Sequence, residues 1–264
     1  MLKYMKLLLY ISKEQKQVEG LRRLLSYTRR AVDDYQMIQE GDKIAVGVSA
    51  GKDSLALLYT LANLQRFYPK SFQLVAVTID MGFEGSDFST VNRLCEELNV
   101  PYFVKKTEIA KIVFDIRKEP NPCSLCAKLR RGILNETAKQ YGANKVALGH
   151  HFDDVVETFM MNLFFEGRIG TFSPVTYLDR SDITLIRPFI YVPEKDVRYF
   201  AKRAALPVIK SPCPADGNTE RERIKRLLAD LEKANKGLKH RILTAIQKGN
   251  VDGYFERKIK IYKD

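Results

Sequence analysis

One stretch in the first quarter of the chain, residues 43–54, constrains the fold more than any other. It reads Lys-Ile-Ala-Val-Gly-Val-Ser-Ala-Gly-Lys-Asp-Ser, so an apolar run stops at three small residues, and a helical pattern follows from Leu55. The pattern predicts a buried strand, a tight turn and a helix N-terminus. Such a turn directs backbone N–H groups and the positive end of a helix dipole at one place, which suits the phosphates of a nucleotide. Lys52 would add a positive charge, and Asp53 would hold Mg²⁺ or fix the loop.

The turn lacks the G-x-x-x-x-G-K-[ST] pattern of the Walker A loop, because Val46 stands five residues before Gly51 and Asp53 follows Lys52. It resembles the S-G-G-x-D-S signature of the PP-loop ATP pyrophosphatases, which cleave ATP to AMP and pyrophosphate. Ala50 departs from that signature, since it stands where the first glycine is expected. A methyl group is tolerated there if φ is negative. The alternative interpretation is an ordinary strand-to-helix turn.

Strand-like runs alternate with helical patterns along the middle of the chain. This alternation predicts an α/β fold, a doubly wound, Rossmann-like parallel sheet of five strands of the PP-loop/HUP type. The expected strands are 43–48, 73–80, 101–107, 145–148 and 184–188. Ligands of such sheets bind at the carboxyl ends of the strands, at the switch point of strand order. Three candidate groups follow strand ends: the 49–54 loop, Asp80, and the turn at 149–154.

We expect three parts in the chain of 264 residues: an N-terminal helical extension at 1–40, a catalytic domain at 41–217 and a basic helical C-terminal region at 218–264. The net charge is +12, and the excess lies in 105–131 and 218–264, which favours nucleic acid as a partner over a merely solvated basic surface. No segment has the pattern of a secretory signal or a membrane span, so we predict a cytoplasmic protein that does not bind membranes.

Four cysteines are too few for a disulfide framework in a chain of this length. Cys123 and Cys126 form a C-x-x-C pair at the start of a predicted helix, 125–141, and in a reducing cytosol such a pair is typical of a metal or redox site. Cys213, between two prolines, is the natural third ligand, and three thiolates would leave one position open for catalysis. The alternative is a redox pair with Cys213 incidental. Cys95 lies in a helical pattern and is expected in the core.

The segment 122–132, the turn Gly-His-His-Phe-Asp-Asp at 149–154 and the triplet Ile-Arg-Pro at 186–188 resemble the tRNA 2-thiocytidine biosynthesis family, over roughly residues 20–230. That resemblance implies ATP, tRNA and a [4Fe–4S] cluster on three cysteines. The cluster would be held by Cys123, Cys126 and Cys213. One departure is that family members often carry a further cysteine near the third ligand, where this chain has Pro214-Ala215-Asp216.

The implied reaction adenylates O2 of a cytosine in an anticodon loop, and sulfide then displaces AMP to leave 2-thiocytidine. The expected nucleotide-binding residues are Ser49, Gly51, Lys52, Asp53, Ser54, Asp80, Gly149 and His150. The expected catalytic residues are Asp53, Asp153, Asp154 and Arg130. For one of the adjacent aspartates, a role as a first-turn carboxylate of the following helix is the alternative. His150 and His151 are weak candidates for zinc, because adjacent side chains point in different directions.

Several alternatives remain open at the level of sequence. They are a 2-thiouridine-type thiolase, a persulfide sulfurtransferase without a cluster, and a non-catalytic RNA-binding protein with a structural zinc. A PP-loop enzyme that uses an amine nucleophile would leave the three cysteines without a role. The expected partners are tRNA and a sulfur donor, either a cysteine desulfurase or free sulfide. A homodimer is a further possibility from the N-terminal helix and the strand-like tail at 251–264.

Overall fold

The computed structural model describes residues 2–118, 122–210, 212–214 and 220–255, with side chains described from residue 18 onward. The strands are β1 (Asp42–Gly47), β2 (Phe72–Asp80), β3 (Tyr102–Lys106), β4 (Lys145–Ala147), β5 (Val175–Leu178) and β6 (Ile183–Ile186). The α-helices are α1 (Leu2–Asp34), α2 (Lys52–Leu64), α3 (Ser89–Glu97), α4 (Pro122–Gln140), α5 (Phe152–Phe165), α6 (Glu194–Arg203), α7 (Glu220–Ala234) and α8 (Leu238–Lys248). A π-helical turn, Lys111–Arg117, and a 3₁₀ turn, Val251–Gly253, complete the described elements.

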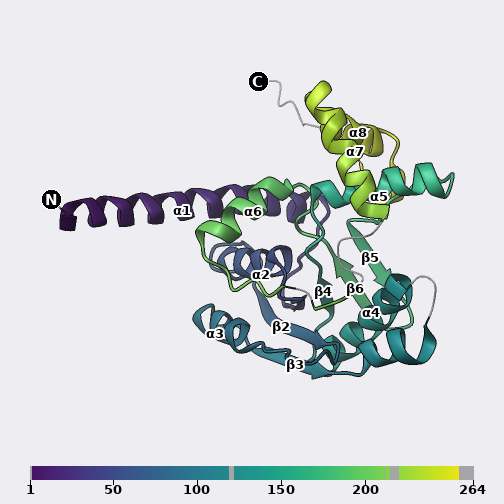
Figure 1. Ribbon diagram of the computed structural model, residues 1–264, viewed down its shortest axis with the longest axis horizontal. Coiled ribbons are helices and arrows are strands. Elements are labelled where there is room, and N and C mark those ends of the chain that lie inside the picture. The colour runs from purple at the N-terminus through teal and green to yellow at the C-terminus, as the bar shows by residue number, and fades with distance from the viewer. Residues whose placement is uncertain (1, 119–121, 211, 215–219, 256–264) are drawn as a thin grey trace.

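The six strands form one sheet in the order β3-β2-β1-β4-β6-β5. All neighbours pair in parallel except β5, which pairs antiparallel with β6 (Figure 1). The doubly wound α/β class is therefore confirmed, and the predicted count of five strands is wrong. Sequence analysis missed β5 because it has only four residues and lies half-exposed at the sheet edge, so it lacks the long apolar run of a buried parallel strand.

Strand order reverses between β1 and β4, which lie side by side although α2, β2, α3, β3 and α4 separate them in sequence. Both strands are buried, and Ile44 of β1 pairs with Leu74 on one side and with Lys145 on the other. In open α/β sheets, ligands bind in the crevice outside the carboxyl ends of the strands at such a switch point. The fold thus places the 49–54 loop and the 149–154 turn beside each other.

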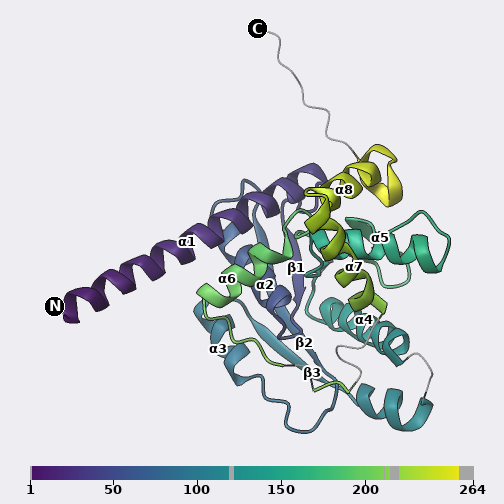
Figure 2. The same ribbon diagram turned by 45° about the horizontal axis from the view of Figure 1, so that its top comes forward.

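Side chains of β1 alternate between two cores. Ile44 and Val46 face the main core with α1, α2 and α6, whereas Ala45 faces a smaller core completed by Leu134 and Ala138 of α4. Figures 1 and 2 show these helices on opposite faces of the sheet. Alternation follows from the two-residue period of a strand. The cysteine helix α4 is therefore held against the face that borders the crevice.

Most of the N-terminal extension expected at 1–40 is one helix, α1, which includes residues 2–12 and ends at Asp34, and its N-terminal part projects beyond the body of the molecule (Figures 1 and 2). None of the described helices is both long and apolar enough to cross a membrane. Helices α7 and α8 pack on α5. Of the tail predicted to have strand character, 251–253 form a 3₁₀ turn instead, and 256–264 lie outside the described residues.

Candidate active site

The 49–54 loop closes on itself through the hydroxyl of Ser54, which is buried. Ser54 Oγ accepts from the backbone N–H of Ser49 at 3.1 Å, lies 3.2 Å from Ser49 Oγ, and donates to the Gly51 carbonyl at 3.0 Å. Gly51 is the N-cap of α2 in an extended conformation. The loop therefore presents the amino-terminal end of a helix in a fixed shape, which is the arrangement that binds phosphate.

Ala50 adopts a left-handed conformation with φ of +60°. The condition of a negative φ, under which a methyl group would be tolerated, is therefore not met. A left-handed backbone costs a non-glycine residue on the order of 1 kcal/mol. The methyl group of Ala50 is buried in the main core, and its carbonyl accepts a hydrogen bond from the Ile209 N–H at 3.0 Å. These contacts hold the strained turn in place.

Lys52 is half-buried, with its Nζ 2.8 Å from Asp53 Oδ2 and 3.1 Å from Glu194 Oε1. Glu194 is buried at the start of α6 and also pairs with Lys225 of α7 and Arg198. Burial opposes ionisation of Glu194, but the hydrogen bond from Lys225 and the charge of Lys52 lower its pKa to about 2. A carboxylate that sequence analysis did not single out therefore positions the lysine of the loop.

Gly149 lies where the turn after β4 touches the 49–54 loop. A Cβ atom at this position would come within 3.1 Å of the backbone carbon of Asp53 and 3.2 Å of the Ser54 nitrogen. Backbone atoms cannot avoid such a contact by rotating, as the end of a flexible side chain can, so the backbone itself would have to shift. A larger residue at this position would therefore push the two loops apart by a few tenths of an ångström.

Gly149→Ala should therefore displace the 49–54 loop and weaken ATP binding about 10-fold or more. Isothermal titration with ATP measures the effect. Gly132→Ala is the matched control, because a Cβ at that helical position meets nothing within 4 Å. It should leave the affinity unchanged and raise stability by roughly 0.5–1 kcal/mol. Equal ATP affinities for Gly149→Ala and the parent would contradict the close-approach argument.

The two adjacent aspartates at the start of α5 have different contacts. Asp154 forms a capping box with His151: its carboxylate accepts the His151 N–H at 2.9 Å, and its own N–H donates to His151 Nδ1 at 3.3 Å. Asp153 is buried and accepts from the Glu194 N–H and from Lys239 Nζ of α8, both at 2.7 Å. Asp153 thus ties α5 to α6 and α8, whereas Asp154 also reaches the cavity.

A cavity of about 750 Å³ lies between the 49–54 loop, the turn after β4 and helix α4. Its volume falls in the range of small-molecule sites. Of the residues expected from sequence, those that line it are Ser49, Asp53, Ser54, Gly149, His150, Asp154 and Arg130. Gly51, Lys52, Asp80 and Asp153 are not among its lining residues. Asp80 accepts the Gly82 N–H at 3.0 Å at the end of β2. The roles of all these residues stay predictions.

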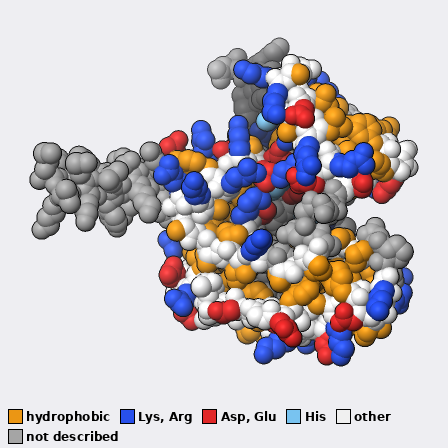
Figure 3. Space-filling model, in the orientation of Figure 1, with side chains coloured by type: hydrophobic (Ala, Val, Ile, Leu, Met, Phe, Trp, Pro, Cys, Tyr) orange, Lys and Arg blue, Asp and Glu red, His pale blue; other side chains and the backbone are white. Residues whose placement is uncertain are grey.

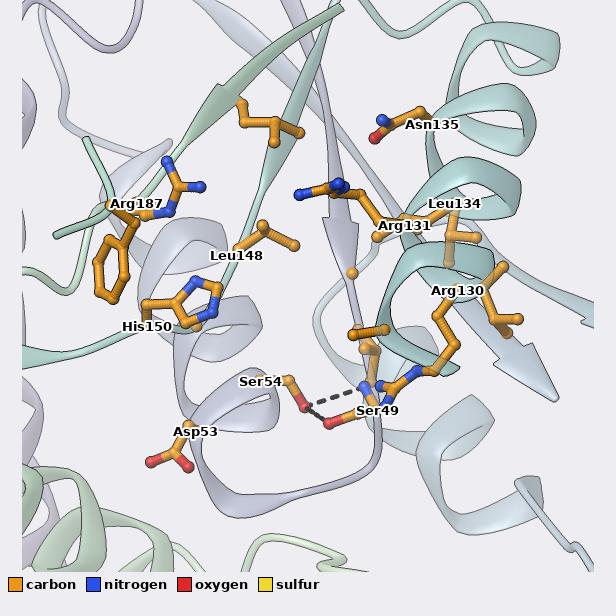
Figure 4. A pocket seen from close by; sticks show the side chains of 18 of the residues that line it. Ser49, Asp53, Ser54, Arg130, Arg131, Leu134, Asn135, Leu148, His150 and Arg187 are labelled. Atoms are coloured by element: carbon orange, nitrogen blue, oxygen red, sulfur yellow. Dashed lines mark hydrogen bonds between the residues drawn. The ribbon is translucent and has the colours of Figure 1, made fainter. Parts of the chain in front are cut away.

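The opposite wall of the cavity is basic. Arg130 and Arg131 of α4 line it, and Figure 4 shows both on the helix that faces His150 and Arg187. Arg187 follows β6 and is buried, and burial lowers its pKa to about 10. In sequence it was noticed only as part of the Ile-Arg-Pro triplet. Its position directly after a strand that ends at this edge is the signal that would have marked it as a site residue.

Two of the three candidate ligand cysteines lie in the first two turns of α4, which starts at Pro122 rather than at the predicted residue 125. Cys123 is exposed, and Cys126 and Cys213 are half-buried. Burial raises the pKa of the Cys126 thiol. The charge of Arg130 and its hydrogen bond to Cys126 lower that pKa, and the charges of Cys213 and Cys123 raise it further. Both other thiols are therefore near enough to Cys126 to influence its ionisation.

All four cysteines are in the described part of the chain, and none forms a disulfide. Cys95 is buried in the main core as predicted, and burial raises its pKa to about 12. Within the described ranges, no three His, Cys, Asp or Glu side chains are close enough to hold a single metal ion. A [4Fe–4S] cubane spaces its cysteine sulfurs more widely than one ion does. The three thiols fit that larger group in ligand type and number, although none of them is among the residues that line the cavity.

Glu157 lies one turn after Asp154 and is buried, with its Oε2 atom 3.6 Å from Arg221 Nη1. Burial and the charge of Asp154 raise its pKa to about 7. A carboxyl whose pKa rises on folding binds its proton more tightly in the folded state. Its contribution to stability is therefore complete below its usual pKa of 4.5 and is lost as the pH rises through 7.

Glutamine cannot ionise, so Glu157→Gln should not lose stability as the pH rises through 7. The variant should be more stable than the parent by roughly 2 kcal/mol at pH 8, with little difference at pH 4. Urea unfolding of parent and variant at both pH values measures the difference. A difference between the two proteins that does not depend on pH would show that Glu157 does not titrate in this range.

A turn at the switch point of a parallel sheet, at the N-terminus of a helix and closed by paired serines, is the arrangement expected of a PP-loop nucleotide-binding protein. The model of the PP-loop domain family matches residues 21–232. A tRNA-cytidine(32) 2-sulfurtransferase of Geobacter sulfurreducens is 41% identical over 225 residues, which cover 84% of this chain and 87% of that protein. Another, from Citrifermentans bemidjiense, is 39% identical over 228 residues, 85% of this chain and 89% of that protein. The chain belongs to this family of tRNA-thiolating PP-loop transferases.

The fold is also that of a solved structure, the U34-tRNA thiolase NcsA from Methanococcus maripaludis with its [4Fe-4S] cluster. The TM-score is 0.72 at 28% sequence identity, and the match covers 94% of this chain and 83% of that chain. Similarity at this level confirms the PP-loop architecture expected from the sequence.

Proposed function

We propose that this protein is an ATP-dependent tRNA sulfurtransferase that converts a cytidine of the anticodon loop to 2-thiocytidine. The observation that carries the proposal is the meeting of two elements at one cavity. The 49–54 loop forms one side, and the first turns of α4, which bear Cys123 and Cys126, form another through Ser124, Ala127 and Arg130. The relatives named tRNA-cytidine(32) 2-sulfurtransferase support cytidine 32 as the target.

The reaction has two steps. The base O2 attacks the α-phosphorus of ATP, and the bond to pyrophosphate breaks. Sulfide then attacks C2 and loses its proton, the C2–O2 bond breaks, and AMP leaves with the oxygen. AMP is a far better leaving group than hydroxide, which is why the base must be activated first. No electrons are gained or lost overall, so the protein needs only to position reactants and stabilise charge.

The chain's own residues divide this work. The 49–54 loop and Lys52 would bind the phosphates, with Mg²⁺ near Asp53, and Arg130 would stabilise charge on the leaving pyrophosphate. Asp154 is favoured over Asp153 for proton handling, because Asp154 lines the cavity and Asp153 is engaged with α6 and α8. Bound on Cys123, Cys126 and Cys213, a [4Fe–4S] cluster would supply an open iron position for sulfide.

The tRNA would lie across the basic face. Figure 3 shows Lys and Arg side chains gathered over α1, α6 and α7 on the side of the molecule that bears the C-terminal helices. A positive surface of this kind binds the phosphate backbone irrespective of sequence. We also propose a cytoplasmic location, a cysteine desulfurase or free sulfide as the sulfur donor, and a homodimer as a possible assembly.

Nucleoside analysis tests the proposal. Anaerobically reconstituted protein, ATP, Mg²⁺, sulfide and tRNA should yield 2-thiocytidine and an equal amount of AMP. A matched tRNA with uridine at position 32 is the control and should yield neither. The thiouridine alternative keeps some support from the NcsA likeness. Formation of 2-thiouridine instead of 2-thiocytidine would favour it, and absence of any thionucleoside would contradict sulfur transfer to tRNA.

A further inference from the structure

One wall of the cavity combines an aromatic ring with two polar side chains from different elements. His150 follows β4, Phe172 precedes β5, and Arg187 follows β6. All three line the cavity. The His150 and Phe172 ring centroids are 4.8 Å apart, and the Arg187 guanidinium carbon lies 5.1 Å from the Phe172 centroid. We call these three residues the β4–β6 wall.

Two nitrogens of this wall are buried without a hydrogen-bond partner among the described residues: His150 Nδ1 and Arg187 Nε. Leaving such a group unpaired costs about 1–3 kcal/mol. Arg187 is not loose, because its Nη1 donates to the Ser173 carbonyl at 2.5 Å and to Thr176 Oγ1 at 3.1 Å. The protein thus anchors one side of the guanidinium and leaves the buried Nε–H of a cavity-lining residue without a partner, which points to a ligand as its partner.

The wall carries little charge besides that of Arg187. Burial and the nearby charge of Arg187 lower the pKa of His150 to about 4, so its imidazole is neutral at pH 7 and carries one N–H. An aromatic face with two directional polar atoms suits a planar heterocycle better than it suits a phosphate. The phosphate-binding loop lies at the other end of the cavity, as Figure 4 shows.

We propose that the β4–β6 wall is the subsite for the extruded target base, with Arg187 Nε–H donating to N3 of cytosine and His150 Nδ1–H donating to O2. The proposal rests on the proposed function. In Figure 4 His150 lies between Arg187 and the 49–54 loop, so this order places O2 on the side of the loop where ATP would be attacked. Phe172 provides an apolar face for the ring.

This assignment predicts discrimination between the two pyrimidines. Cytosine presents adjacent acceptors at O2 and N3, which match two donors. Uracil carries a hydrogen on N3, and arginine has no acceptor to receive it. A buried donor that faces another donor loses its hydrogen bond and stays desolvated, so the wall should reject uracil by about 10-fold or more in affinity.

The test compares binding of anticodon stem-loops with cytidine or uridine at position 32 to the full chain purified without a cluster, by fluorescence anisotropy. The parent should bind the cytidine loop about 10-fold more tightly. Arg187→Met should reduce the ratio to near one while the ATP affinity stays within about twofold of the parent. Arg187→Lys, which retains a donor and the charge, should keep part of the preference. Arg180→Met, on the exposed turn between β5 and β6, is the matched control and should change neither affinity.

An unchanged cytidine preference in Arg187→Met would overturn the assignment. So would a 10-fold loss of ATP affinity in that variant, because Arg187 would then serve the nucleotide. Should Arg187→Met not fold, the Arg187→Lys variant carries the same comparison, because a smaller cytidine preference at unchanged ATP affinity is expected for it. The nucleoside assay keeps the two proposals apart: a parent that thiolates tRNA but shows no base preference refutes only the subsite.

Discussion

Replacing Cys123, Cys126 or Cys213 by alanine should abolish both the iron content and the thiolation activity. Protein purified without oxygen should contain about four irons and four sulfides per chain, and each variant should retain less than about a tenth of them. The reason is the number of ligands: the three thiols are the complete protein ligand set of the proposed cluster, so two cannot hold it. Iron, acid-labile sulfide and visible absorption measure the loss.

Cys95→Ala is the matched control for these variants. Cys95 is buried in the main core and away from the cavity lining, so its loss should cost roughly 1 kcal/mol of stability and no iron. Retention of iron by all three ligand variants would contradict the cluster assignment. Zinc without sulfide in the parent would contradict it as well and would favour a structural metal.

Lys52→Met should lower the rate of AMP formation by about 10³-fold and weaken ATP binding. The positive charge of Lys52 lies at the N-terminus of α2, where the phosphates are expected, and burial limits its screening by solvent. The neutral methionine keeps the length and packing of the side chain. Quenched-flow analysis of AMP in the presence of saturating tRNA measures the effect.

Lys52→Met also removes an ion pair with buried Glu194. A loss of AMP formation caused by this structural change must therefore be distinguished from one caused by the loss of the charge near the phosphates. Arg198→Met removes another cation from that carboxylate, at 3.1 Å from Glu194 Oε1, without touching the loop. It should leave AMP formation within about threefold of the parent, since the Arg198 side chain is exposed and Glu194 keeps its pairs with Lys52 and Lys225. Equal losses in the two variants would show that Glu194, rather than the loop lysine, limits the activity.

Much of the fold could be predicted because the buried parallel strands are recognisable in the sequence as apolar runs. Residues 43–48 and 73–80 are long apolar runs, and glycine or proline marks their ends, so the fold class followed directly. The edge strand β5 carries no such run, and its existence depends on pairing with β6. The start of α4 was placed three residues late, because Pro122 was interpreted as a break although proline favours the first turn of a helix.

The positions of the site loops could be predicted from sequence motifs. The hydrogen-bond and ion-pair partners of individual side chains could not. The 49–54 loop and the 149–154 turn meet as expected, because both follow neighbouring strands. The different contacts of Asp153 and Asp154 depend on α6 and α8, which pack there from later in the chain. The left-handed conformation of Ala50 could not be foreseen either, since its cost is offset by burial that only the folded core provides.

The central claim is that the base oxygen is activated by adenylation before sulfur replaces it. An anticodon stem-loop labelled with ¹⁸O at O2 of cytidine 32 tests this directly. Because the C2–O2 bond breaks as AMP departs, the heavy oxygen should appear in AMP, one atom for each 2-thiocytidine formed, when the nucleotides are analysed by mass spectrometry. Heavy oxygen in pyrophosphate, inorganic phosphate or water, with unlabelled AMP, would contradict the account.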